Sequence, residues 1–188
     1  MTTAQVRRYG VAVTAGTLVW VGGLLTVGAN PATSDGITIG DLTGLAFQLG
    51  LFALLRVQLR TRATSRVSVA MLYVESVLLA LATTWSVLHA AVPAWRDAPW
   101  LAVLDACWPL SMLGMFVIGL KVALAGRWRG LARIWPLVAE TWVVVTIASM
   151  ILFGRGVGEW VGIAHLLVGY TGLGIVLAWR PHLTDTGS

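Results

Sequence analysis

Residues 67–91 read VSVAMLYVESVLLALATTWSVLHAA, an apolar run that carries one acid, Glu75, and one imidazole, His89, near its end. A helix needs about 20 mostly apolar residues to cross the ~30 Å hydrocarbon core of a bilayer. The run is therefore long enough to span a membrane. An ionisable side chain at that depth costs about 2.5–3.5 kcal/mol on insertion scales, so Glu75 indicates a functional role.

Five more apolar segments of similar length surround this run, at about 9–29, 41–60, 99–122, 134–154 and 157–179. The chain has 188 residues, 57% hydrophobic and 11% charged, whereas soluble domains are about 25% charged. The sequence predicts an all-α polytopic membrane protein, a six-transmembrane-helix bundle that forms one domain over residues 1–188. The first segment is longer than the ~7–15 apolar residues of a signal peptide, so we expect a retained helix.

Basic residues gather at those segment ends that would share one side of the membrane. They are Arg7, Arg8, Arg56, Arg60, Arg62, Arg66, Lys121, Arg127, Arg129, Arg133 and Arg180. Only Arg96 and Arg155 fall on the other side. The positive-inside rule then places both termini in the cytoplasm. The net charge of +5 is thus an orientation signal, and we expect no nucleic-acid partner. The excess of arginine over lysine suggests a bacterial cytoplasmic membrane.

A weak internal repeat relates the second and third segments to the fourth and fifth. Asp41 and Glu75 correspond to Asp105 and Glu140, at offsets of 64 and 65 residues. Transporters often contain such repeats, with the substrate site at the repeat interface. The alternative is chance matching in an apolar sequence. Asp41 itself is interpreted as the N-cap of the second segment.

Three carboxylates fall inside predicted spans and are the expected catalytic residues: Asp105, Glu75 and Glu140. From the helix rise, Glu75 and Glu140 lie about 13 and 10 Å from the inner face, and Asp105 about 9 Å from the outer face. We expect all three to face a shared cavity. The alternative is that each acid bonds to a neighbouring helix and only fixes packing.

Aromatic and imidazole side chains at depth are the expected substrate-binding residues. They are Trp20, Trp85, Trp108, Trp142, Tyr170, His89 and His165. Aromatic faces attract cations, and a carboxylic acid in apolar surroundings can stay protonated near neutral pH. The other tryptophans, including Trp160, are interpreted as an interfacial aromatic belt.

No cofactor or metal is expected. No local ligand motif supports haem ligation by His89 and His165. None supports a metal site formed by these histidines with Asp105 and Glu159. The sequence contains no Gly-rich phosphate loop, His-Glu-x-x-His or Gly-x-Ser-x-Gly motif.

Three functions remain open. The first is a membrane-embedded, cofactor-free enzyme whose buried acids start a carbocation-type isomerisation or cyclisation of a lipophilic, isoprenoid-like substrate. The second is a proton-coupled transporter or channel for a cation or amphipathic small molecule. Six short helices are few for alternating access, so this function predicts a homodimer or partner subunits. The third is a non-catalytic membrane anchor or sensor subunit.

Overall fold

The computed structural model describes residues 1–185, in which every regular element is a helix. Three long helices form the first half: α1 (Thr3–Val27), α2 (Ser34–Arg60) and α3 (Val69–Ala91). Each is apolar and long enough to cross a bilayer. These helices overlap the first three predicted segments, and the first two begin six or seven residues earlier than predicted.

The second half consists of three interrupted helices. α4 (Pro99–Asp105) continues into α5 (Cys107–Ala125) as one span. α6 (Gly130–Glu140) and α7 (Trp142–Phe153) are bent by 43° relative to each other. α8 (Arg155–Leu166), the π-helical turn η2 (Leu167–Thr171) and α9 (Gly172–Trp179) form the last span. Short 3-10 turns, η1 (Pro93–Trp95) and η3 (Pro181–Thr184), complete the elements. With five long helices, or six if the bent pair counts as one span, the chain has the make-up of a multi-pass membrane protein.

The second helix begins earlier than predicted. Thr33 is its N-cap, and the Thr33 hydroxyl accepts a hydrogen bond from the Gly36 amide at 3.1 Å. Asp35 in the first turn complements the positive end of the helix dipole. Asp41 therefore lies two turns inside α2, and its interpretation as an N-cap is wrong. This position frees its carboxylate for a contact with another helix.

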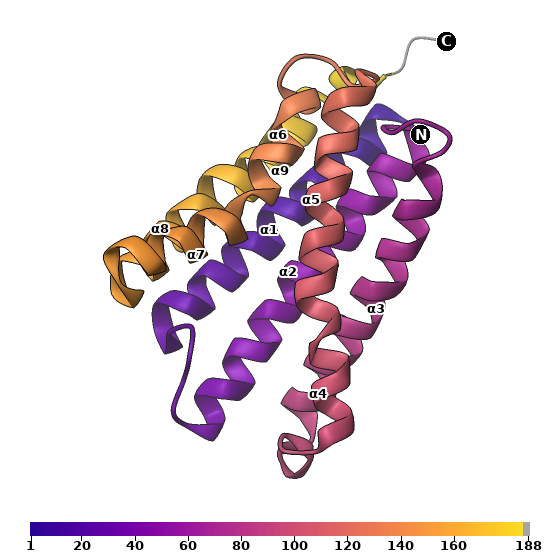
Figure 1. Ribbon diagram of the computed structural model, residues 1–188. Coiled ribbons are helices and arrows are strands. Elements are labelled where there is room, and N and C mark those ends of the chain that lie inside the picture. The colour runs from indigo at the N-terminus through magenta and orange to yellow at the C-terminus, as the bar shows by residue number, and fades with distance from the viewer. Residues whose placement is uncertain (186–188) are drawn as a thin grey trace.

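Glycines let α1 pack closely against its neighbours in the middle of the bundle (Figure 1). A Cβ on Gly10 would lie 2.6 Å from the Gly174 carbonyl oxygen of α9. A Cβ on Gly16 would overlap the Ala46 carbonyl oxygen of α2. Small residues at such crossings allow the close backbone approach that membrane helices use for association. α1 and α2 thereby form a close-packed helix pair at the centre of the fold.

α7 and α8 form a separate arm that diverges from α3 and α4 (Figure 1). The two helices pack on each other where Gly162 meets Thr146, and a Cβ on Gly162 would lie 2.8 Å from the Thr146 hydroxyl. Each helix of the arm is interrupted where it joins the rest of the bundle. The bend at Thr141 precedes α7, and the π-helical turn η2 follows α8. Thr141 marks the bend, and its hydroxyl donates to the Val138 carbonyl at 2.7 Å and contacts Nε2 of His165 at 3.2 Å. The contact with His165 joins the bend to α8.

Candidate functional site: a tryptophan-lined cavity

A cavity of about 690 Å³ lies between the α7–α8 arm and helices α3, α4 and α5, with α1 and α2 contributing to its wall. Its lining includes residues 28–31 of the α1–α2 connection. It therefore belongs to the end of the bundle opposite both chain termini (Figure 1). The divergence of the arm from α3 and α4 creates this space.

The four deep tryptophans named from the sequence all line this cavity, each from a different helix. Trp20 of α1 is central to the group. Its ring meets Trp108 of α5 edge to face at a centroid distance of 6.2 Å, and Trp142 of α7 at 5.5 Å. Trp85 of α3 stacks on His89 at 4.5 Å. Trp160, interpreted from sequence as part of an interfacial belt, also contributes to the lining.

Acidic groups share the wall with these rings. Asp41, Asp105 and Glu159 line the cavity, whose lining contains no lysine or arginine. Oδ2 of Asp41 lies 2.7 Å from Nδ1 of His89, and their side chains are only 10% and 17% exposed. Asp41 was missed as a site residue because it was interpreted as a helix cap. The lining thus contains three acidic side chains and one imidazole, and of the acids Asp41 contacts the imidazole.

Arg96 holds the α3–α4 connection against the start of α2 beside the cavity. Its guanidinium donates to the His89 carbonyl at 3.0 Å, to the Ser34 hydroxyl at 3.0 Å and to the Thr38 hydroxyl at 2.8 Å. Its hydrogen bonds thus go to neutral oxygens of the scaffold. Arg96 fixes the position of His89 and does not form part of the lining.

Two buried polar atoms of the lining lack a hydrogen-bond partner among residues 1–185. Gln48 donates through Nε2 to the Ser86 hydroxyl at 2.9 Å, which leaves its Oε1 without a donor. Nε1 of Trp142 is likewise buried without an acceptor. An unmade buried hydrogen bond costs about 1–3 kcal/mol. The Gln48 acceptor is therefore available to a bound molecule or to water.

Glu75 and Glu140 do not line the cavity, so the expected convergence of all three acids is wrong. Of the three acids expected to converge, only Asp105 lines the cavity. Glu140 is the last residue of α6, on the other side of the bend from Trp142, and it is bonded to Tyr170. Glu75 shares a helix face with His89 but lies fourteen residues from it, about 21 Å along α3. Their positions along the helices separate these two acids from the site.

Each of these two acids instead accepts a hydrogen bond from a hydroxyl group. Tyr170 donates to Oε2 of Glu140, and Ser111 donates to Oε1 of Glu75 at 2.5 Å. Both carboxylates are buried, and neither forms an ion pair with a residue of the described chain. These bonds match the packing alternative in part, but the second oxygen of each carboxylate has no partner among residues 1–185.

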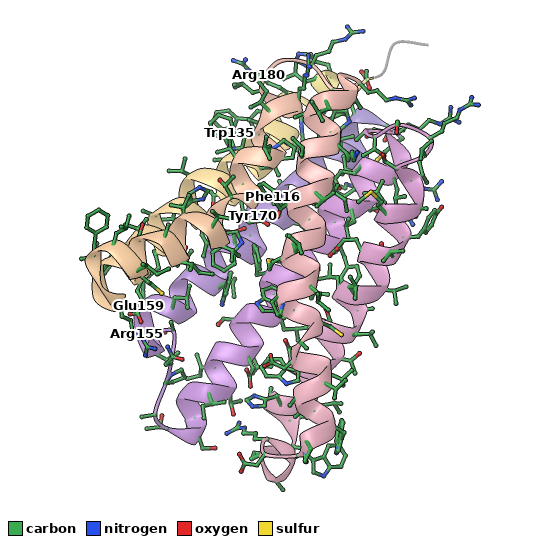
Figure 2. All side chains as sticks on the ribbon, in the orientation of Figure 1. Phe116, Trp135, Arg155, Glu159, Tyr170 and Arg180 are labelled. Carbon is green, nitrogen blue, oxygen red and sulfur yellow. The ribbon has the colours of Figure 1, made fainter. Side chains whose placement is uncertain are left out.

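Tyr170 and His165 also lie outside the cavity lining. Tyr170, in the π-helical turn, meets Phe47 edge to face at 4.9 Å, and Phe47 stacks on Trp20 at 4.6 Å. Figure 2 places Tyr170 in the middle of the bundle. His165 contacts Thr141, while His89 lies at the cavity wall, so the two histidines are not brought together. Within residues 1–185, no three His, Cys, Asp or Glu side chains are grouped to hold a metal ion.

Comparisons with protein-family models, with curated proteins and with solved structures found no match to this chain.

Proposed function

We propose that the protein is a proton-coupled transporter that binds a lipophilic organic cation in the tryptophan-lined cavity. One observation carries the proposal: five tryptophans and three carboxylates line a single cavity that has no basic side chain in its wall except His89. A cation over an aromatic face gains roughly 0.5–2 kcal/mol or more, most when desolvated. Carboxylates add a charge attraction that a neutral ligand does not receive.

The size and polarity of the cavity suit a compact amphipathic molecule. Drug-sized ligands occupy sites of about 300–1,000 Å³ with a few placed polar groups, and this cavity measures about 690 Å³. The unpartnered Oε1 of Gln48 supplies one acceptor. Asp105 is exposed and Glu159 half-buried, so charge is available where the ligand enters.

The direction of entry follows from the basic residues. The ends of α2, α5 and α9 lie with the termini and carry arginine or lysine, including Arg180 (Figure 2). Arg155 lies at the opposite end, near Glu159 (Figure 2). The positive-inside rule supports cytoplasmic termini. In this proposal the membrane is a bacterial cytoplasmic membrane, and the cavity opens outward.

Glu140 and Tyr170 are the proposed proton-binding groups. A carboxylate buried without a basic partner is costly in a membrane, and such residues mark proton pathways. Phe47 lies between this pair and the cavity, since its ring contacts both Tyr170 and Trp20. A change of protonation at Glu140 can therefore reach the cavity through packed rings.

The weak internal repeat predicted from the sequence fits the same assignment. Asp41 and Asp105, offset by 64 residues, both line the cavity. Glu75 and Glu140, offset by 65 residues, are both buried and both accept a bond from a hydroxyl. In transporters, repeat-related elements commonly surround the substrate and coupling-ion sites.

The α7–α8 arm is the proposed moving part. Helix bends and π-helical turns often occur at functional hinges. The bend at Thr141 and the turn at residues 167–171 interrupt both connections of the arm to the rest of the bundle. A rigid-body rotation about these two points would widen or close the cavity. Because six helices form a small carrier, we expect a homodimer or partner subunits.

The experiment uses purified protein in liposomes with tetraphenylphosphonium as the lipophilic cation and a trapped pH dye. The proposal expects saturable cation movement with opposite proton movement, and its loss in the double variant Asp41→Asn/Asp105→Asn. Asp97→Asn is the control, because Asp97 is exposed outside the cavity. Cation binding without any proton movement above protein-free liposomes would overturn the transport proposal.

A second candidate is the membrane-embedded enzyme, now with a different acid. The 2.7 Å contact between Asp41 and His89 supports an acid–base pair at the cavity wall, and the tryptophans would stabilise a carbocation. Product formation from an isoprenoid panel, lost in His89→Gln, would favour this function. If neither flux nor turnover occurs, a non-catalytic anchor or sensor remains.

A further inference from the structure

A second hollow, of about 230 Å³, lies between α3 and α5 and shares no lining residue with the tryptophan cavity. Apolar side chains form its wall, among them Met71, Leu78 and Ile118, and Glu75 is the one ionisable residue there. Val74 at its edge is 60% exposed. We call this hollow the Glu75 crevice.

The crevice opens on a surface that is apolar. Tyr73 and Val74 on α3 are 62% and 60% exposed, and Leu113 on α5 is 61% exposed. Both helices are apolar enough to cross a membrane. Exposed apolar residues on such helices face hydrocarbon in a bilayer. A molecule that enters the crevice across this apolar surface would therefore come from the lipid phase.

Glu75 provides one free acceptor at the base of the crevice. The residue is 1% exposed, and Ser111 occupies its Oε1 at 2.5 Å. Its Oε2 is buried and has no hydrogen-bond partner among residues 1–185. Gly114 makes this arrangement possible, because a Cβ at that position would overlap Oε2. A buried carboxyl oxygen that has no hydrogen-bond partner among residues 1–185 therefore lies beside an apolar hollow.

We propose that Glu75 is a second ligand site, which takes an apolar molecule with one terminal hydrogen-bond donor, a hydroxyl or a protonated amine, from the bilayer. The donor bonds to Oε2, and the apolar chain lies against Val74 and Leu78. Satisfying a buried acceptor removes a penalty of about 1–3 kcal/mol. The site is separate from the tryptophan cavity and does not depend on the transport proposal.

A hydrophobic carbodiimide, dicyclohexylcarbodiimide, tests whether Glu75 is reachable from lipid. The carboxyl proton passes to one carbodiimide nitrogen while the carboxyl oxygen bonds to the central carbon, which gives an O-acylisourea. Migration of the acyl group from oxygen to nitrogen then gives a stable N-acylurea. Nothing leaves, so the modified residue carries the full added mass, and peptide mass spectrometry of the wild-type protein in liposomes locates it.

We expect the hydrophobic reagent to label Glu75 and to leave Glu140 unlabelled, because Glu140 is buried and lines neither of the two cavities. A water-soluble carbodiimide should instead modify the exposed Asp105. Labelling of Glu75 by the water-soluble reagent at an equal rate would overturn the lipid-facing site. So would the absence of Glu75 labelling by the hydrophobic reagent.

Competition tests the ligand class. Dodecylamine or dodecanol should slow labelling of Glu75 about tenfold at a concentration about ten times its Kd. Dodecane, which has the chain but no donor, should not. Equal protection by dodecane would overturn the requirement for a donor. Labelling of Glu75 should be unchanged in Trp108→Leu, which alters the other cavity. If the Glu75 labelling experiments fail, the proposal of cation transport is unaffected. If the liposome transport assay fails, the proposed ligand site at Glu75 is unaffected.

Discussion

Oδ2 of Asp41 lies 2.7 Å from Nδ1 of His89, so that a carboxylate of α2 and an imidazole of α3 meet on the wall of the tryptophan-lined cavity. The two residues are 48 positions apart in sequence. Trp85 stacks on the imidazole at 4.5 Å and Arg96 donates to the His89 carbonyl, which together fix the ring. This pair is the one contact between an acid and a basic side chain within 4 Å in the described part of the chain.

Asp41→Asn should weaken binding of tetraphenylphosphonium roughly tenfold, about 1.4 kcal/mol, because the side chain keeps its shape but loses its negative charge. Titration of the cation, followed by quenching of tryptophan fluorescence, measures the Kd. The matched control is Asp97→Asn, a neutralised acid outside the cavity. Equal weakening by both substitutions would show that only the overall charge matters.

Trp108→Leu should weaken binding of the same cation about twofold to thirtyfold, the range expected from about 0.5–2 kcal/mol for one aromatic face. Binding of an uncharged molecule of similar size, triphenylphosphine oxide, should change much less, because a neutral ligand lacks the cation–π attraction. Trp179→Leu is the control, since that ring is 79% exposed at the end of α9. A parallel loss for charged and uncharged ligands would instead indicate a simple packing role.

Glu140→Gln should remove proton movement in the liposome assay and leave the cation Kd within about twofold. Glutamine has no proton to exchange in this range, yet its amide oxygen can still accept from Tyr170. Glu140→Leu leaves the Tyr170 hydroxyl unpaired and should cost about 1–3 kcal/mol of stability, seen as a lower Tm in detergent. Undiminished proton movement in Glu140→Gln would assign coupling to another residue.

Gly10→Ala should destabilise the bundle by about 1–3 kcal/mol, the usual cost of overpacking, because the new Cβ would lie 2.6 Å from the Gly174 carbonyl oxygen. Thermal unfolding in detergent measures the change. Gly22→Ala, also on α1, is the control, since a Cβ there would meet nothing within 4 Å. A Tm that falls equally in both variants would contradict the close contact of α1 with α9.

The spans could be predicted from the sequence because burial in lipid is a local property of the chain. Twenty or so apolar residues are enough to define a membrane helix, whatever the other helices do. The predicted segments 67–91 and 157–179 correspond closely to helices Val69–Ala91 and Arg155–Trp179. Helix ends were less accurate, because a cap such as Thr33 is a single hydroxyl contact.

The site could be predicted only in part. Trp20 and Trp142 were predicted from their depth and residue type to line a cavity, and both line the same one. The same criteria grouped Glu75 and Glu140 with Asp105, although the cavity excludes both. Depth along a span can be counted from sequence, whereas the direction of a side chain depends on how each helix is rotated against its neighbours.

By itself, then, the sequence determined that this chain forms apolar helices of membrane-spanning length and that acids and tryptophans lie within them. Only the tertiary structure decided which of these side chains meet. The rotation of α2 against α3 brings Asp41 to His89, and the bend at Thr141 swings the α7–α8 arm outward to open the cavity. The first depends on contacts between α2 and α3 that lie 48 positions apart, and the second on a change of direction within one apolar segment; hydropathy and spacing encode neither.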